Sequence, residues 1–105
     1  MVRHPGVSLI SFTGSCAVGA AIAASCGKDL KRVSLELGGK NAQIVMEDAD
    51  LGLAVEAAWW GAFATAGQRC TATSRLILHE KIHEKFLERF VARARKTKLG
   101  PGDDP

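Results

Sequence analysis

Hydrophobic and polar positions divide the first third of the chain into short strand-like and helix-like segments. Residues 7–12 (VSLISF) form an apolar, β-branched run between turn residues, which is typical of a buried strand. Residues 15–26 are rich in small side chains and predict a helix with Ser15 at its N-terminus and Gly27 closing it. Residues 32–37 (RVSLEL) predict a second strand.

The middle of the chain combines strand patterns with an apolar helix. Residues 41–46 (NAQIVM) predict a third strand, after which Asp48 or Asp50 caps a helix over residues 51–66. That helix is hydrophobic on nearly all sides, which is typical of a helix buried in a larger body. Residues 75–79 predict a fourth strand.

The last third predicts an amphipathic helix over residues 81–98, ended by the glycines and proline at 100–102. Its apolar side chains recur on one face: Ile82, Phe86, Leu87, Phe90, Val91 and Ala94. Alternating strands and helices predict the α/β class. Because no element closes the sequence after this helix, and the apolar helix lacks covering partners, we expect a fragment of a longer protein.

Composition and charge narrow the function classes. The chain is 47% hydrophobic and 24% charged, as in a folded globular protein, and its formal charge is +3. Basic side chains concentrate in residues 80–98, but no nucleic-acid-binding motif accompanies them, and Phe86 and Phe90 belong to the apolar stripe. The pattern favours a solvated helix face, with anion binding as the alternative, and no nucleic-acid partner is expected.

The three cysteines point to a reducing compartment. Cys16, Cys26 and Cys70 are an odd number and have no metal-ligand spacing, so neither a disulfide framework nor a metal site is expected. Residues 4–6 (HPG) interrupt any secretory signal, and no apolar run approaches the roughly 20 residues that cross a bilayer. We therefore expect a cytoplasmic protein without a membrane partner.

Two motifs in the first half of the chain are candidates for binding and catalysis. Thr13-Gly14-Ser15 joins a strand to a helix N-terminus, where backbone N–H groups and the helix dipole favour an anion; a plain turn is the alternative. Glu36 ends an apolar strand beside two glycines. If partly buried, it can act as a base near neutral pH; the alternative is a salt bridge to Arg32 or Lys40.

The third candidate is Cys70, which follows Gly67-Gln68-Arg69 at the end of the apolar helix. A neighbouring arginine favours the reactive thiolate, although a structural cysteine is the alternative. Cys16 and Cys26 lie in the small-residue helix and are interpreted as packed, inert thiols.

Taken together, the motifs resemble the aldehyde dehydrogenase superfamily. ISFTGS at 10–15, LELGGKN at 35–41 and FATAGQRCTATSR at 63–75 have the order and spacing of that family. Glu36 and Cys70 are 70 − 36 = 34 positions apart, the family's usual separation. The sequence around Cys70 (GQRCTATSR) most resembles that of bacterial semialdehyde dehydrogenases.

The resemblance implies a catalytic role for two residues. Cys70 would be the nucleophile that forms a thiohemiacetal and then a thioester, and its backbone N–H would form half of the oxyanion hole. Glu36 would be the base that activates water to hydrolyse the thioester. CoA-acylating members of the family typically lack this glutamate, so its presence favours the acid-forming reaction, with CoA acylation as the alternative.

The resemblance also implies an NAD or NADP site and a division into two domains. Residues 1–37 would end the Rossmann-like cofactor domain, and residues 38–105 would begin the catalytic domain. The implied cofactor contacts are Thr13, Gly14 and Ser15 at the pyrophosphate, Gly19 for close helix packing, and the Leu37 carbonyl at the nicotinamide amide.

Family members are several times longer than 105 residues and would form homo-oligomers acting on small-molecule aldehydes. Cys16 stands where the family usually has threonine. We expect the isolated fragment to be inactive. The alternative is a truncated, non-catalytic product that binds partners or aggregates through uncovered faces around Trp59, Trp60 and Phe63.

Overall fold

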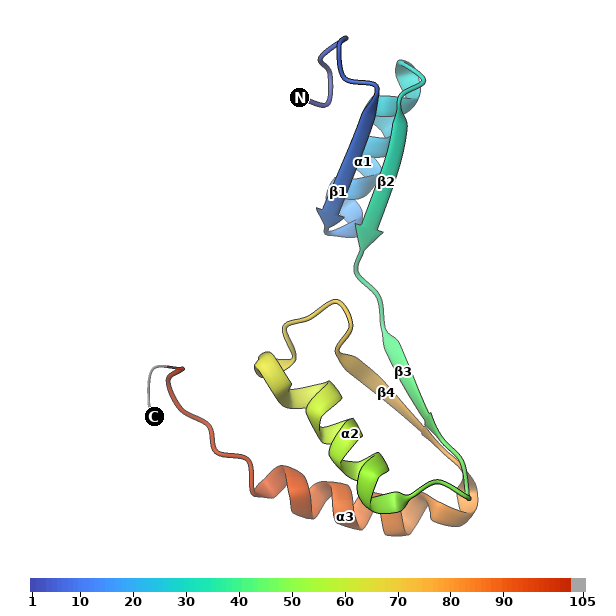
Figure 1. Cartoon of the computed structure of the whole chain (residues 1–105), viewed down its shortest axis with the longest axis vertical. Coiled ribbons are helices and arrows are strands. Elements are labelled where there is room, and N and C mark those ends of the chain that lie inside the picture. Colours follow the sequence, from blue (N-terminus) through green and yellow to red (C-terminus); the bar gives the residue numbers. More distant parts are fainter. Residues whose placement is uncertain (103–105) are drawn as a thin grey trace. The chain divides into compact units, whose positions relative to one another are not determined.

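The computed structural model describes residues 1–102, which form two compact units, Met1–Gly39 and Lys40 onward. Helices and strands alternate in both units (Figure 1), so the α/β prediction is confirmed. The division lies close to the expected boundary after residue 37. The assignment of the units to a cofactor domain and a catalytic domain stays a prediction.

The N-terminal unit is a β–α–β element. Strands β1 (Leu9–Gly14) and β2 (Arg32–Leu37) pair in parallel, and helix α1 (Cys16–Lys28) connects them and packs against both (Figure 1). Ser15 caps α1 as predicted, since its hydroxyl accepts the Val18 N–H at 3.3 Å. A parallel pair needs such a crossover connection because both strands run in the same direction.

Two local predictions in this unit were wrong. The first strand begins and ends later than residues 7–12, so Thr13 and Gly14 belong to β1 and not to a turn. Gly27 lies inside α1, which continues to Lys28, and Leu30 adopts the left-handed conformation beyond the helix (φ 54°). A leucine there carries the steric cost that a glycine avoids.

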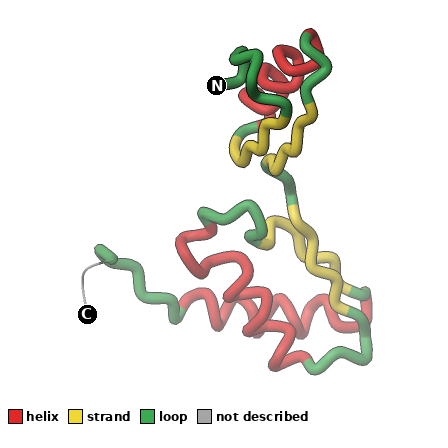
Figure 2. The backbone as a smooth tube through the Cα atoms, turned by 45° about the horizontal axis from the view of Figure 1, so that its top comes forward, coloured by secondary structure: helices red, strands yellow, loops and turns green. Residues whose placement is uncertain are grey.

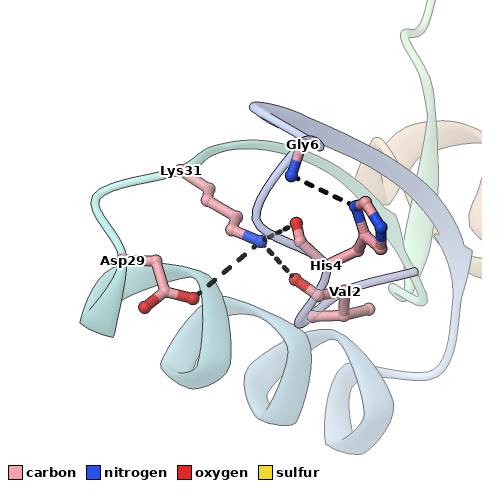
Figure 3. A network of polar contacts seen from close by, with 5 residues as sticks. All are labelled: Val2, His4, Gly6, Asp29 and Lys31. Atoms are coloured by element: carbon pink, nitrogen blue, oxygen red, sulfur yellow. Dashed lines mark hydrogen bonds and ion pairs between the residues drawn. The ribbon is translucent and has the colours of Figure 1, made fainter.

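A buried lysine ties the N-terminal segment to the end of α1 (Figure 3). The Lys31 ammonium donates to the carbonyl oxygens of Val2 at 2.9 Å and His4 at 2.7 Å, and lies 3.9 Å from the Asp29 carboxylate. Its side chain is only 5% exposed. The contacts hold the segment before β1 in place, because a buried ammonium without partners is unfavourable.

The second unit repeats the strand–helix–strand order and adds a helix. Strands β3 (Asn41–Val45) and β4 (Thr73–Leu78) pair in parallel, with helix α2 (Leu51–Phe63) between them in sequence. Helix α3 (His83–Arg95) packs against α2 and crosses it at an angle (Figure 2). Two short 3₁₀ segments, Ala64–Gly67 and Glu80–Ile82, follow α2 and β4. The core consists of Val45, Val55, Ala58, Ile82 and Phe86.

The boundaries of this unit differ from the sequence pattern at the ends of its helices. Asp50, one of the two expected caps, accepts the Leu53 N–H at 3.0 Å. Helix α2 ends at Phe63 and not near residue 66, because the next residues leave the helical conformation. Helix α3 covers a shorter range than 81–98, and β4 begins at Thr73, before the predicted residue 75.

The apolar helix is only partly buried within these residues. Val55 and Ala58 lie in the core, whereas Leu53 is 71% exposed and Trp60 is 57% exposed. Trp59 is half-buried: its indole N–H donates to the Thr97 hydroxyl at 2.7 Å, and the Arg93 guanidinium lies 3.5 Å from its ring centroid. Between residues 1 and 102, no helix is long and apolar enough to cross a bilayer.

Candidate functional site

In the N-terminal unit the candidate residues meet at the carboxyl ends of the two strands. The parallel register places Thr13 beside Glu36 and Gly14 beside Leu37. Ser15 follows directly at the start of α1. The carboxyl edge of a parallel sheet is where α/β proteins bind ligands, so the pairing collects the predicted binding residues where a ligand is expected.

The start of α1 presents hydrogen-bond donors without acceptors. The first helical bond runs from the Gly19 N–H to the Ser15 carbonyl at 2.9 Å, and the Val18 N–H is taken by the Ser15 hydroxyl. Within residues 1–102 the backbone N–H groups of Cys16 and Ala17 have no acceptor. Such orphan donors, with the positive end of the helix dipole, attract an anion.

Gly19 is a point of close approach between α1 and β2. A Cβ atom built there would lie 2.6 Å from Cδ2 of Leu37, well inside van der Waals contact. The absence of a side chain therefore lets the helix sit close to the strand end that carries Glu36 and Leu37.

The environment of Glu36 differs from the sequence-based expectation. Its side chain is exposed and not partly buried, and within its own unit it forms no ion pair, including with Arg32. Neighbouring residues of a strand point to opposite faces of the sheet, so Glu36 is buried only if another part of the protein covers the face to which it points. Within the N-terminal unit the Glu36 carboxylate therefore faces solvent at the carboxyl end of β2.

The prediction that both helical cysteines are packed is confirmed for Cys26 and wrong for Cys16, and the inertness of their thiols stays a prediction. Cys26 is buried at 1% exposure. Cys16 is exposed, because it is the first residue of α1, and its thiol donates to the Gly38 carbonyl at 3.7 Å.

In the second unit Cys70 lies on an exposed turn between α2 and β4. The Ala72 N–H donates to the Arg69 carbonyl at 3.1 Å, which closes a turn with Cys70 and Thr71 at its two central positions. The thiol is free and exposed. Within residues 1–102 the Cys70 N–H has no hydrogen-bond acceptor, so it is available to a ligand.

The backbone leading to this turn is strained. Thr65, Ala66 and Gly67 have φ values of 55°, 54° and 67°, in the left-handed region. Only the glycine adopts that region without steric cost, and a β-branched threonine there is a true outlier. Strain of this kind is concentrated at functional sites, where surrounding contacts hold it.

Arg69 anchors the turn to α2. Its guanidinium carbon lies 4.2 Å from the centroid of the Trp60 ring, and its Nη2 donates to the Trp60 carbonyl at 3.3 Å. The Nε atom is buried and has no partner within the described residues. The stacking fixes the residue immediately before the thiol.

Asn41 holds the other side of the turn, and the sequence analysis missed it. Its Nδ2 donates to the carbonyl oxygens of Cys70 at 2.5 Å and Ala72 at 3.2 Å. The β3–β4 register shifts directly after Asn41, where the pairing passes over Ser74. Asn41 is the last residue of the LELGGKN motif at 35–41, but the motif does not reveal this contact, which joins residues 29 positions apart.

The structure therefore brings six of the candidate residues together in one unit: Thr13, Gly14, Ser15, Gly19, Glu36 and Leu37. Cys70 belongs to the second unit. No group of three His, Cys, Asp or Glu side chains able to hold a metal ion occurs in residues 1–102.

Known proteins decide the family. All of residues 1–105 match the Aldehyde dehydrogenase family. The chain belongs to the aldehyde dehydrogenase family. Betaine aldehyde dehydrogenase 1 of Oryza sativa subsp. japonica is 52% identical over 99 residues, which cover 94% of this chain and 20% of that protein.

Two solved structures share the fold of this chain. PnpE from Pseudomonas sp. WBC-3 is 50% identical with a TM-score of 0.92, over 99% of this chain and 21% of that one. A betaine aldehyde dehydrogenase from Staphylococcus aureus, solved in complex with NAD⁺, is 41% identical with a TM-score of 0.93, over 99% and 21%. The chain thus has the fold of one part of an aldehyde dehydrogenase and spans about a fifth of these relatives.

Proposed function

We propose that these residues belong to a longer enzyme that oxidises an aldehyde to a carboxylic acid with NAD or NADP. The observation that carries the proposal is the Cys70 turn: an exposed thiol whose backbone N–H is free, held between Arg69 and Asn41 after a strained segment. Family membership supplies the reaction class.

The N-terminal unit suits a dinucleotide. The unpaired N–H groups of Cys16 and Ala17 at the start of α1 match a pyrophosphate, with Thr13, Gly14 and Ser15 around them. Gly19 keeps the helix close to Leu37, whose carbonyl is the proposed contact for the nicotinamide amide. NAD, which the Staphylococcus aureus relative binds, would supply the hydride acceptor when bound.

The chain's own residues would do the covalent chemistry. The Cys70 thiolate attacks the aldehyde carbonyl carbon and forms a thiohemiacetal, while the oxyanion accepts a hydrogen bond from the free Cys70 N–H. Loss of hydride from that carbon leaves a thioester on Cys70. Glu36 then takes a proton from water, the hydroxide attacks the thioester, and the carboxylic acid leaves as the thiolate is restored.

Several finer assignments are part of the proposal. Residues 1–37 would end the cofactor domain and residues 38–105 would begin the catalytic domain of a cytoplasmic homo-oligomer. Its substrate would be a small aldehyde, and the wording around Cys70 favours a semialdehyde. The rest of the enzyme would complete the oxyanion hole and the adenine site, so the 105 residues alone are expected to be inactive.

Two substitutions in the full-length protein test the proposal. Cys70→Ala should abolish NADH formation from aldehyde, whereas Cys26→Ala, which removes a buried thiol, should retain it. Glu36→Gln should keep the first burst of NADH and slow later turnover by about 100-fold or more, with thioester accumulating on Cys70.

Two outcomes would contradict parts of the mechanism. Full activity of Cys70→Ala would show that another group is the nucleophile. Normal steady-state turnover of Glu36→Gln would remove the base assignment, and NADH formation that requires CoA would instead favour the CoA-acylating alternative.

A further inference from the structure

We propose that Asn41 is a positioning residue for Cys70: its side-chain amide fixes the turn that presents the thiol and the free backbone N–H. This inference rests on the proposed function, because it assigns a role within the same site. Asn41 is the first residue of β3. Its side-chain amide donates one hydrogen bond to the carbonyl of Cys70 and one to the carbonyl of Ala72.

The geometry of the two contacts explains what Asn41 does. Both protons of one amide nitrogen are used, so the carbonyls of Cys70 and Ala72 are held at a fixed separation around the turn. Among residues 1–102, a single backbone bond closes the turn itself, from the Ala72 N–H to the Arg69 carbonyl at 3.1 Å. Fixing the Cys70 carbonyl orients the peptide after the thiol.

The peptide before the thiol is held separately. Arg69 is anchored on Trp60 by ring stacking at 4.2 Å and by a hydrogen bond at 3.3 Å. The two anchors act on opposite sides of Cys70, so together they restrict both of its backbone dihedral angles. The thiol nucleophile and the N–H that binds the oxyanion both belong to Cys70 and must face the same substrate carbonyl group. The backbone of Cys70 must therefore be held in one conformation.

The first residues of β3 and β4 place the Asn41 amide beside the Cys70 turn. The register shift after Asn41 leaves Ser74 without a partner across the ladder, and such bulges change the direction of side chains beside active sites. Arg75 donates from Nη1 to the Lys40 carbonyl at 3.0 Å, which ties the residue before Asn41 to β4. The amide is therefore presented by a supported strand end and not by a mobile loop.

The test compares two substitutions of Asn41 in the full-length protein. Asn41→Ala removes the amide, and Asn41→Asp keeps its shape but replaces the donor with a carboxylate that faces two carbonyl oxygens. Gln43→Ala is the matched control, since Gln43 is the next residue on the same face of β3 and its amide has no hydrogen bond within the described residues.

Four quantities are measured for each variant: the melting temperature, the rate of the first NADH burst, KM for aldehyde, and the alkylation rate of Cys70 by iodoacetamide, followed by peptide mass mapping. Both Asn41 variants should lower the burst rate by roughly 10-fold to 100-fold, the size expected for a slightly misplaced reacting group. KM for aldehyde should stay within a few-fold. Gln43→Ala should behave like the unsubstituted protein.

Alkylation separates positioning from general damage. Iodoacetamide reaches an exposed thiol without needing the fixed turn, so alkylation of Cys70 in Asn41→Ala should change by less than a few-fold although the burst is slow. An unchanged burst rate in both variants would overturn the inference. Failure of both variants to fold, or a burst lost only in proportion to folded protein, would also overturn it, because Asn41 would then be a structural residue.

The Cys70→Ala variant shows whether a negative result contradicts the positioning role of Asn41 or the proposed function itself. If Cys70→Ala is inactive and the Asn41 variants are normal, only the positioning role falls. If Cys70→Ala is active, the proposed function falls whatever the Asn41 variants do.

Discussion

Lys31 shows how much of the N-terminal unit depends on a single buried charge. Two carbonyl oxygens and one carboxylate surround its ammonium, yet the carboxylate of Asp29 is half-exposed and 3.9 Å away. An exposed ion pair contributes little, whereas hydrogen bonds from a buried charged donor contribute more. The carbonyls of Val2 and His4 therefore account for most of the stabilisation.

Lys31→Met keeps the length of the side chain and removes the donor. We expect it to lower the free energy of unfolding by about 1 to 3 kcal/mol, because the Val2 and His4 carbonyls lose a charged donor. Asp29→Asn should cost less than about 1 kcal/mol, as for an exposed pair. Urea unfolding of the full-length protein measures both. Equal losses in the two variants would show that the ion pair, and not the carbonyl contacts, carries the effect.

At the scale of elements, the presence and order of the strands and helices could be predicted, whereas several of their ends could not. Ser15 and Asp50 are capping residues that the chain uses as expected, and the second strand has the predicted bounds. The end of α2 was missed because the left-handed backbone at Thr65 and Ala66 opposes the preference of both residues. Surrounding contacts impose such strain, so the local pattern does not reveal it.

The candidate site, too, could be predicted from the sequence only in part. The residues that the family motifs contain could be named from the sequence, and the β1–β2 register places Thr13 and Glu36 side by side. The contacts that hold the Cys70 turn, from Asn41 and Trp60, depend on side chains that meet only after folding. Asn41 lies in a quoted motif and Trp60 in a predicted helix, but neither position shows which group of the Cys70 turn the side chain contacts.

The packing of α1 on β2 leads to a prediction for Gly19. Gly19→Ala should lower the free energy of unfolding by about 1 kcal/mol net, because the added methyl group forces the Leu37 side chain to move. Gly27→Ala is the matched control: it lies in the same helix with no atom within 4 Å of the added group, so it should raise stability by about 0.5 kcal/mol.

The double variant Gly19→Ala/Leu37→Ala tests the cause. If the clash with Leu37 is responsible, removing the leucine side chain recovers part of the loss, and the two changes are not additive in urea unfolding. Strict additivity would mean that Gly19 acts in some other way. Since Leu37 is a proposed cofactor contact, Gly19→Ala should also weaken NAD binding, measured by calorimetry on the full-length protein.

At the scale of the whole molecule, much apolar surface is uncovered within residues 1–102. Leu53, Trp60 and Phe63 on α2, and Ile44 and Ile77 on the two strands of the second unit, are all exposed. A monomeric protein rarely leaves so many large apolar side chains in water without a partner. The chain spans about a fifth of its relatives, so the remaining sequence of a longer enzyme is the cover that the proposed function predicts.

The native polypeptide that carries these residues should therefore have a mass several times 11.1 kDa, as measured on protein from its source cell. The full-length protein should bind little of a hydrophobic dye such as anilinonaphthalene sulfonate. The 105-residue chain alone should bind the dye strongly, because the apolar faces of α2 and the strands are then open to water. The short chain should also show no NAD binding. A native mass near 11.1 kDa would remove the case for catalysis and leave the non-catalytic alternative, in which Trp60 and Phe63 contact a partner. Weak dye binding by the short chain would instead show that it covers its own apolar side chains, by rearrangement or self-association, which a concentration series by analytical ultracentrifugation distinguishes.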